Sequence, residues 1–209
     1  MTEQLVLDRG PRVPFIFRWI GKLGLWMLGW RVRGNVPPEE PKAIFIASPH
    51  TTNWDGVVMV LVSLAMGIRL SWLGKKSLFT GPKGILMRFA GAVPVDRSGG
   101  LDTVQQVAKT FKETDKIFLA VAPAGTRKKT NHWKTGFYHM AIAADVPIFC
   151  GYLDYSRGEG GVLSVVRPSG DIEADIERFQ EIYADVRGGR PENETLIQLK
   201  RADPKPAVE

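Results

Sequence analysis

The chain has 209 residues, 44% of them hydrophobic and 24% charged, which is the composition of an ordinary globular protein with room for one domain and a substantial core. Its single cysteine, Cys150, excludes an intramolecular disulfide and fits a reduced, cytoplasmic compartment. The net charge of +6 favours an anionic partner. Nucleic acid is not expected as that partner, because no zinc-finger spacing, RNA-binding signature or long basic run is present.

The first element in the chain is an apolar segment at 14–30, whose only charged residues are Arg18 and Lys22. On a helix its three tryptophans share one face: Trp19, Trp26 and Trp30. A signal peptide is not expected, because the segment carries internal cations and no small-residue cleavage site follows it. A spanning helix is marginal at this length.

Two interpretations of this segment are open. Aromatic side chains with flanking cations are typical of a helix that lies in a membrane interface, and we expect 1–40 to be such a helix with its lead-in. The other interpretation is a helix packed on the core of the protein itself. The first implies a peripheral or monotopic protein on an anionic phospholipid membrane.

Strands and helices alternate along the rest of the chain. The predicted strands are 43–48, 69–74, 92–96, 117–122 and 147–155, with 162–168 as a hairpin partner of the last. The predicted helices are 54–66, which we expect to be largely buried, and 83–91, 101–113, 135–145 and 171–186. This order predicts a single α/β domain over 41–186, with a central mostly parallel or mixed sheet flanked by helices. The tail at 187–209 is rich in Gly, Pro and charge, and we expect it to be loosely held.

The first group with chemical potential is SPHTTNWDG at 48–56, where a predicted strand ends and a helix begins. His50 lies in the turn and Asp55 in the first helical turn. On one continuous helix the two side chains would diverge by about 140°, but from a loop folded over the helix start they can meet. A carboxylate on one imidazole nitrogen fixes the tautomer, and the other nitrogen can accept a proton from a hydroxyl. Alone, such a pair is as compatible with helix-dipole stabilisation as with catalysis.

Two further turns place an arginine beside glycine where a strand ends. GAVPVDRSGG at 91–100 contains Arg97, and APAGTRKK at 122–129 contains Arg127. Guanidinium binds phosphate in a bidentate fashion, and glycine lets a backbone approach a phosphate closely. The amides of Gly125 and Thr126 are also candidates for holding an oxyanion. Taken singly, each arginine is better explained as part of an ordinary surface turn.

In this order, four blocks resemble the glycerophospholipid acyltransferase family, which includes the lysophosphatidic acid and glycerol-3-phosphate acyltransferases. The family pattern is H-x4-D, then a Gly…Arg block, then P-E-G-T-R, then V-P-I. The corresponding blocks are HTTNWD (50–55), GAVPVDR (91–97), PAGTR (123–127) and VPI (146–148). They span about 100 residues of the 209. H-x4-D alone is a weak signal, whereas four ordered blocks are a strong one.

The resemblance implies acyl transfer from acyl-CoA or acyl-carrier protein to a hydroxyl, with no metal, cofactor or covalent enzyme intermediate. In this family pattern His50 is the general base and Asp55 orients it. Arg97 and Arg127 hold the phosphate of the acceptor. Lys75 and Lys76, in KKSLF at 75–79, lie in a segment that looks like the one between the first two blocks, and they are candidates for contacting anionic substrate.

The chain departs from the family pattern at Ala124, where the third block usually has glutamate. In the family this glutamate is thought to position the acceptor, and alanine cannot accept a hydrogen bond from a glycerol hydroxyl. The alternatives are a different lipid alcohol or amine as acceptor, or a lipid-binding relative with reduced turnover. A hydrolase that uses the same pair on water is also open, whereas a covalent serine hydrolase is not expected without a nucleophile elbow.

Overall fold

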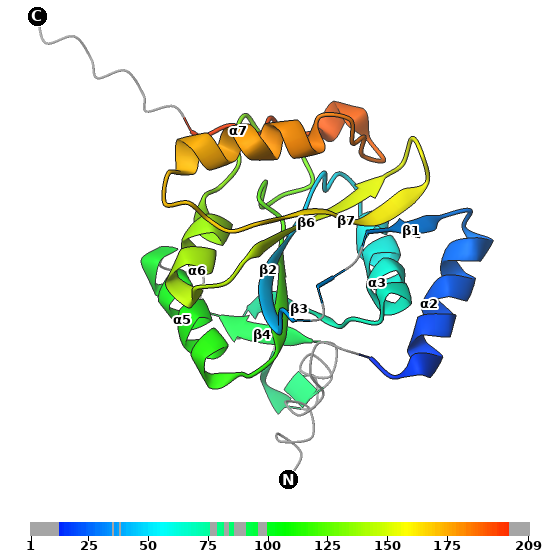
Figure 1. The fold of residues 1–209 in the computed structure, drawn as a ribbon, viewed down its shortest axis with the longest axis horizontal. Helices are drawn as coiled ribbons and strands as arrows, with labels where there is room; N and C mark the ends of the chain where they lie inside the picture. The colour runs from blue at the N-terminus through cyan, green and yellow to red at the C-terminus, as the bar shows by residue number, and fades with distance from the viewer. Residues whose placement is uncertain are drawn as a thin grey trace, which may run out of the picture.

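The computed structural model describes residues 13–34, 36–37, 39–75, 79–81, 84–85, 91–95 and 100–200 (Figure 1). The predicted helix at 83–91 therefore lies largely outside the described residues. Every predicted strand and every other predicted helix is present, with bounds that differ by a few residues at most.

A seven-stranded sheet forms the centre of the molecule, in the order β1-β7-β6-β2-β5-β3-β4 (Figure 1). The bounds are β1 (Arg31–Arg33), β2 (Lys42–Ala47), β3 (Leu70–Lys75), β4 (Ala92–Val95), β5 (Ile117–Val121), β6 (Ile148–Asp154) and β7 (Glu159–Val166). The five strands from β6 to β4 are parallel; β7 runs antiparallel to β6, and β1 runs parallel to β7. The predicted mixed sheet and the predicted hairpin are both confirmed.

Helices cover both faces of the sheet. On one face lie α2 (Phe15–Met27) and α3 (Trp54–Met66), and on the other α5 (Gly100–Glu113), α6 (Gly136–Ala144) and α7 (Ile172–Tyr183) (Figure 1). Asp171, the predicted start of this last helix, is the N-cap of α7, and its carboxylate accepts hydrogen bonds from the amides of Glu173 and Ala174. A short 3-10 helix follows at Pro191–Asn193.

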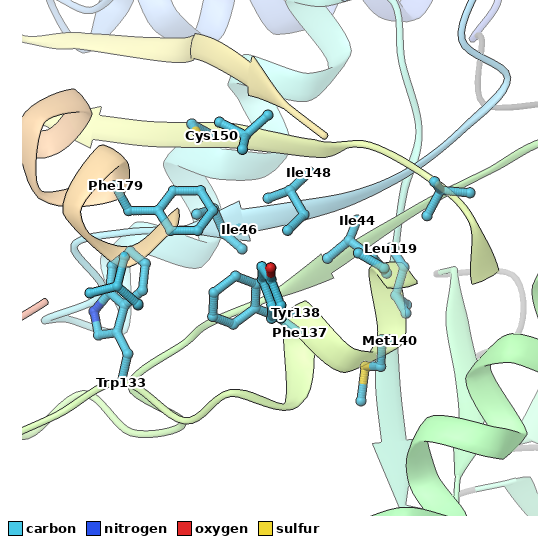
Figure 2. Close-up of a cluster of buried hydrophobic side chains, with 14 of the residues drawn as sticks. Ile44, Ile46, Leu119, Trp133, Phe137, Tyr138, Met140, Ile148, Cys150 and Phe179 are labelled. Atoms are coloured by element: carbon cyan, nitrogen blue, oxygen red, sulfur yellow. The ribbon is translucent and has the colours of Figure 1, made fainter. Parts of the chain in front are cut away.

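Strand β2 explains why the sheet is buried on both sides. Ile44 and Ile46 face the larger core, which α5, α6 and α7 complete, whereas Ala43 and Phe45 face the core on the opposite side. Figure 2 shows Ile44 and Ile46 among the aromatic rings of the larger core. An alternating polar pattern would leave one face unpacked, so the continuous apolar run is required here. Cys150 is buried in the same core, and burial raises the pKa of its thiol to about 12.

Helices α2 and α3 pack antiparallel with their backbones in close contact. A Cβ at Gly21 would lie 2.5 Å from the amide nitrogen of Ala65, and a Cβ at Gly24 would lie 2.9 Å from Leu61. Gly21 and Leu25 are therefore the buried residues of α2. The remaining large apolar side chains of α2 are exposed to solvent: Phe15, Ile16, Phe17, Trp19, Ile20, Leu23, Trp26 and Met27.

Three predictions need correction. Trp30 does not share a helix face with Trp19 and Trp26, because α2 ends at Met27 and the Trp30 ring packs edge-on against Tyr155 at 4.9 Å. α3 is not largely buried, because a stripe of its apolar side chains faces solvent: Trp54, Val57 and Val60.

The C-terminal tail is the third correction. Residues 187–200 are held against the domain, since the Arg190 amide donates to Thr51 Oγ1 and the Trp133 amide donates to the carbonyl of Gln198. Ile197 and Leu199 pack on the larger core. A composition rich in Gly, Pro and charge suggested a loose segment, but backbone contacts that composition does not reveal fix it in place.

Candidate active site

The candidate site lies where β2 and β5 end, side by side. Ile46 of β2 pairs with Val121 of β5, so the turns that follow the two strands leave the same edge of the sheet. After β2 the chain continues into α3 on one face, and after β5 it continues into α6 on the other (Figure 1). In open α/β sheets a crevice opens between two such strands, and ligands bind there. The topology thus brings together the first and third sequence blocks, which lie more than seventy residues apart.

His50 and Asp55 meet as predicted. His50 Nδ1 lies 3.0 Å from Asp55 Oδ2, with the histidine in the loop and the aspartate in the first turn of α3. An ionised carboxylate only accepts hydrogen bonds, so Nδ1 carries a proton, and in the neutral imidazole the lone pair is therefore on Nε2. Within the described part of the chain Nε2 has no hydrogen-bond partner. The His50 side chain is 29% exposed and that of Asp55 is 4% exposed, so solvent or a ligand reaches the imidazole but hardly reaches the carboxylate.

Asp55 is held by four further donors. The amides of Thr51 and Thr52 donate to Oδ2 at 2.7 and 2.9 Å, while the hydroxyls of Thr52 and Tyr155 donate to Oδ1 at 2.6 and 2.7 Å. Burial alone raises the pKa of this carboxyl, but the hydrogen bonds from His50, Thr52 and Tyr155 outweigh burial. The net pKa of Asp55 therefore lies well below its usual value of 3.8, and the group is a fixed anion at neutral pH.

Tyr155 is a site residue that sequence reasoning missed. It follows β6 and lies one hundred residues from its partner Asp55 in the chain. Burial, and then the hydrogen bond to the Asp55 carboxylate, raise its pKa to about 12, so its hydroxyl stays a donor. A tyrosine at the end of a predicted strand, at the same sheet edge as His50, is the only signal the sequence offers for this role.

The third block forms an exposed turn after β5. Gly125 adopts a left-handed backbone with φ of 65°, and its amide donates to the Ala122 carbonyl at 2.9 Å. That amide is therefore engaged within the turn in this structure, and its role as an oxyanion donor stays a prediction. Arg127 is exposed, and within the described residues its guanidinium has no partner. Ala124 is 8% exposed, so its methyl group is buried behind the turn.

Lys134 is a second cation at this turn that the sequence analysis missed. Its ammonium nitrogen lies 2.9 Å from where a Cβ at Gly125 would be, and its amide donates to the Pro123 carbonyl. Lys134 is exposed, so its charge is available to a ligand. Glycine at position 125 leaves room for this side chain, so the turn presents Arg127 and Lys134 together with the Thr126 hydroxyl.

Of the other predicted cations, Lys75 lies within the described residues, at the same edge of the sheet. Lys75 is the last residue of β3 and pairs with Val95, the last residue of β4. Lys76 and Arg97 lie outside the described residues. β3 lies beside β5 in the sheet, so this end of β3 faces the same side of the molecule as the third block.

An apolar cavity begins beside the loop that carries His50. It is bordered by Ser48 and Pro49 at the carboxyl edge of the sheet and by Ile68 and Leu70 at the opposite edge. Met59, Val62 and Met66 of α3 form one wall, and β2 and β6 form the other. The cavity thus lies between α3 and the sheet, and its largely apolar lining suits an apolar ligand better than a polar one.

Within the described residues no group of three or more His, Cys, Asp or Glu side chains is placed to hold a metal ion. In the same residues no helix is both apolar enough and long enough to cross a bilayer.

Residues 30–152 match the family model described as Acyltransferase, which is more than half of the chain and includes all four sequence blocks. The chain belongs to the acyltransferase family. It is 34% identical over 146 residues to the 1-acyl-sn-glycerol-3-phosphate acyltransferase of Haemophilus influenzae, covering 65% of this chain and 58% of that protein. It is 36% identical over 132 residues to the enzyme of that name from Escherichia coli, covering 58% of this chain and 52% of that protein.

This acyltransferase chain spans between half and two thirds of the length of the curated relatives it matches. Its fold is similar to that of the crystal structure of the 1-acyl-sn-glycerophosphate acyltransferase from Thermotoga maritima, with a TM-score of 0.54 and 17% identity. That match covers 79% of this chain and 73% of the other.

The charge of Asp55 should contribute to stability in a pH-dependent way. Asp55→Asn keeps an oxygen for His50 and the two amides, and the hydroxyls of Thr52 and Tyr155 can turn to accept from the new NH₂ group. We expect the variant to fold but to lose about 2 kcal/mol of unfolding free energy at pH 7, since hydrogen bonds to a charged group are the stronger ones.

The folded-state pKa of Asp55 is lowered, so the stability that its charge contributes is complete above the usual pKa of the group. This stability is lost as the pH falls from that value toward the folded-state pKa. Urea unfolding between pH 7 and pH 3 should show the free energies of the two proteins converging at the acid end. Asp145→Asn removes an exposed carboxylate with no hydrogen-bond partner in the described residues and should shift the free energy by less than about 0.5 kcal/mol. A difference in unfolding free energy between wild type and Asp55→Asn that stays constant with pH would contradict the lowered pKa of Asp55.

Proposed function

We propose that this protein transfers a fatty acyl group from an acyl thioester to the free hydroxyl of a lysophosphatidic acid-like acceptor. The observation that carries the proposal is the His50–Asp55 pair, whose Nε2 has no partner among the described residues and lies at the crevice between β2 and β5. Membership of the acyltransferase family and the names of the relatives support the same reaction class.

In the proposed reaction the acceptor hydroxyl donates to His50 Nε2. As its oxygen attacks the thioester carbonyl carbon, the proton passes to Nε2, and the Asp55 carboxylate stabilises the imidazolium that forms. The tetrahedral intermediate collapses with cleavage of the carbon–sulfur bond, and the imidazolium returns the proton to the leaving thiolate. The products are an ester and a free thiol, and no enzyme group is left acylated. The amides of Thr126 and of Trp54, the first residue of α3, are the candidates for holding the oxyanion.

The acceptor phosphate is proposed to bind at the turn after β5. Arg127 and Lys134 supply two positive charges there without competing ion pairs among the described residues. Arg97 and Lys75, from the blocks that end β4 and β3, are proposed to contact anionic parts of the same substrates. The acyl chain is proposed to enter the apolar cavity between α3 and the sheet, which begins at Ser48 beside His50.

The protein is proposed to dock on an anionic membrane, at its cytoplasmic face, through α2. Trp26 is 76% exposed and Met27 is 67% exposed on a helix whose opposite side is fixed to α3 by Gly21. Apolar patches of this size seldom remain exposed in a monomeric soluble protein. Lys22 and Arg31 border the surface with positive charge. The exposed stripe of α3 continues the apolar surface up to Trp54, next to Asp55.

A second candidate acceptor class is favoured by one observation. Ala124 places a buried methyl group where the family pattern has glutamate, so this position offers no carboxylate to a glycerol hydroxyl. A lipid alcohol or amine with a different headgroup is therefore the alternative acceptor for the same His50 chemistry. Turnover measured with a panel of acceptors separates the two classes, since both use the same acyl thioester as donor and differ only in the acceptor.

Removal of the general base should abolish turnover without unfolding the protein. We expect His50→Ala to lower the rate of thiol release from acyl-CoA, with lysophosphatidic acid as acceptor, by about 100- to 10,000-fold. His139→Ala, which removes an exposed histidine on α6, is the matched control and should stay within about twofold of wild type. A folded His50→Ala protein with near-normal turnover would refute the mechanism. Thiol release without ester product would instead indicate hydrolysis.

Removal of either cation of the third-block turn should weaken acceptor binding. Arg127→Ala and Lys134→Ala should each raise KM for lysophosphatidic acid about tenfold, because each removes a charge-assisted hydrogen bond to phosphate. Neither should alter kcat much, and neither should affect a monoacylglycerol acceptor, which lacks the phosphate. Lys109→Ala, on the exposed side of α5, is the control. An unchanged KM in both variants would place the phosphate elsewhere.

Membrane docking should depend on the exposed tryptophans of α2. The double variant Trp19→Ser and Trp26→Ser should bind vesicles of phosphatidylglycerol and phosphatidylcholine at least about tenfold more weakly than wild type in a sedimentation assay. Leu196→Ser is a matched control, because Leu196 and Trp19 are both 55% exposed but Leu196 lies far from α2 in the chain. Equal binding by all three proteins would exclude α2 as the docking element.

A further inference from the structure

A short C-terminal segment, Arg187–Arg190, lies directly against the loop that carries His50. We call these four residues the strap. The Tyr155 amide donates to the Arg187 carbonyl at 2.9 Å, and the Arg190 amide donates to Thr51 Oγ1 at 3.1 Å. The strap is therefore tied at one end to the residue after β6 and at the other end to the residue after His50.

The two glycines in the middle of the strap leave no room for a side chain. A Cβ at Gly188 would lie 2.9 Å from Thr51 Cγ2 and 3.2 Å from Pro49 Cγ. A Cβ at Gly189 would lie 2.9 Å from Tyr155 Cε1 and 3.2 Å from Thr52 Cγ2. These separations are shorter than ordinary carbon–carbon contacts, so a methyl group at either position must displace its neighbours.

Neither glycine is required by its backbone conformation. The glycines with positive φ include Gly125 and Gly170 but not Gly188 or Gly189. Alanine can adopt a backbone outside the left-handed region without strain. Close approach to the loop is therefore the reason for glycine at these two positions.

The residues that the strap contacts are the ones that hold Asp55. Apart from His50, the donors to the Asp55 carboxylate come from Thr51, Thr52 and Tyr155. Gly188 lies against Thr51, Gly189 lies against Thr52 and Tyr155, and Arg190 donates to Thr51. All three donor residues thus have one face on Asp55 and another on the strap.

The strap is itself fixed to the domain. The Gly188 amide donates to Glu194 Oε1, and Val186, which precedes the strap, is 4% exposed. Tyr183 at the end of α7 donates to the Gly151 carbonyl of β6. The strap is therefore held by contacts with the rest of the domain as well as by its contacts with the loop.

We propose that the Gly188–Gly189 strap is a positioning element for the His50–Asp55 pair. It presses Thr51, Thr52 and Tyr155 into the geometry in which their donors meet the carboxylate, and so sets the direction in which Asp55 holds His50 Nδ1. This inference rests on the proposed acyl transfer for its effect on rate, although the contacts that define it do not.

The kinetic test is substitution of each strap glycine by alanine. We expect Gly189→Ala and Gly188→Ala to lower kcat about tenfold or more, since small displacements of a catalytic group are costly, while KM for the acceptor changes less than about twofold. Gly136→Ala is the matched control, because its Cβ would meet nothing closer than Met140 Cε at 4.0 Å. It should retain wild-type kcat and a similar melting temperature.

A rescue variant separates displacement of the loop from general damage. Thr51→Ser removes the Cγ2 methyl, which is the atom nearest to a Cβ at Gly188, and keeps the hydroxyl that accepts from Arg190 and would lie 3.0 Å from that Cβ. The double variant Gly188→Ala and Thr51→Ser should therefore recover part of the lost kcat. If kcat of the double variant does not recover while Thr51→Ser alone is active, overlap with Thr51 is not the reason for the loss in Gly188→Ala.

A spectroscopic measurement keeps the inference independent of turnover. The proton on His50 Nδ1, shared with Asp55, should give a downfield signal in the proton NMR spectrum, and Gly189→Ala should move it upfield because the hydrogen bond lengthens. An unmoved signal together with unchanged kcat would overturn the strap proposal. Absence of thiol release by the wild-type protein with every acceptor would overturn the proposed function instead, and the NMR result would still decide the role of the strap.

Discussion

The structure around the site depends on one buried carboxylate. Asp55 is almost inaccessible to water, and burial alone would favour its neutral form. Five donors from His50, Thr51, Thr52 and Tyr155 reverse this preference and keep it charged. A charged acceptor in turn fixes the Nδ1-protonated tautomer of His50 and leaves Nε2 as a base. The loop, the start of α3 and the residue after β6 all contribute to this arrangement.

The sequence predicts much of this arrangement because its signals are local. Apolar runs locate the strands, and the spacing of His50 and Asp55 requires the loop-to-helix geometry that is observed. Tyr155 escapes prediction because it meets Asp55 through the order of strands in the sheet, which a single sequence does not determine. Lys134 escapes it because the loop between β5 and α6 folds back on its own start, and no local pattern indicates that turn. The end of α2 is missed for a similar reason, since Trp30 leaves the helix to pack on a ring more than a hundred residues away.

The misjudged tail shows the limit of composition as a guide. Gly188 and Gly189 stand in a stretch whose glycine and charge are typical of loose segments. In the structure glycine serves the opposite purpose, because the missing side chains let the backbone pack against Thr51 and Tyr155. The same holds for Gly21 and Gly24, which bring α2 onto α3 and thereby leave its aromatic side chains to face solvent. At these four positions glycine permits close packing of the backbone and does not indicate a flexible segment.

Tyr155 contacts Asp55, the end of the α2 segment and the strap. Its hydroxyl donates to Asp55, its ring packs on Trp30 at the end of the α2 segment, and its backbone amide is bound by the strap. Through Tyr155 the His50–Asp55 pair is linked to the residue that follows α2 by one ring contact and one hydrogen bond, which reaches the Asp55 oxygen that His50 does not contact. The backbone amide of the same tyrosine is bound to the strap, so a displacement of the strap or of Trp30 reaches Asp55 through one residue.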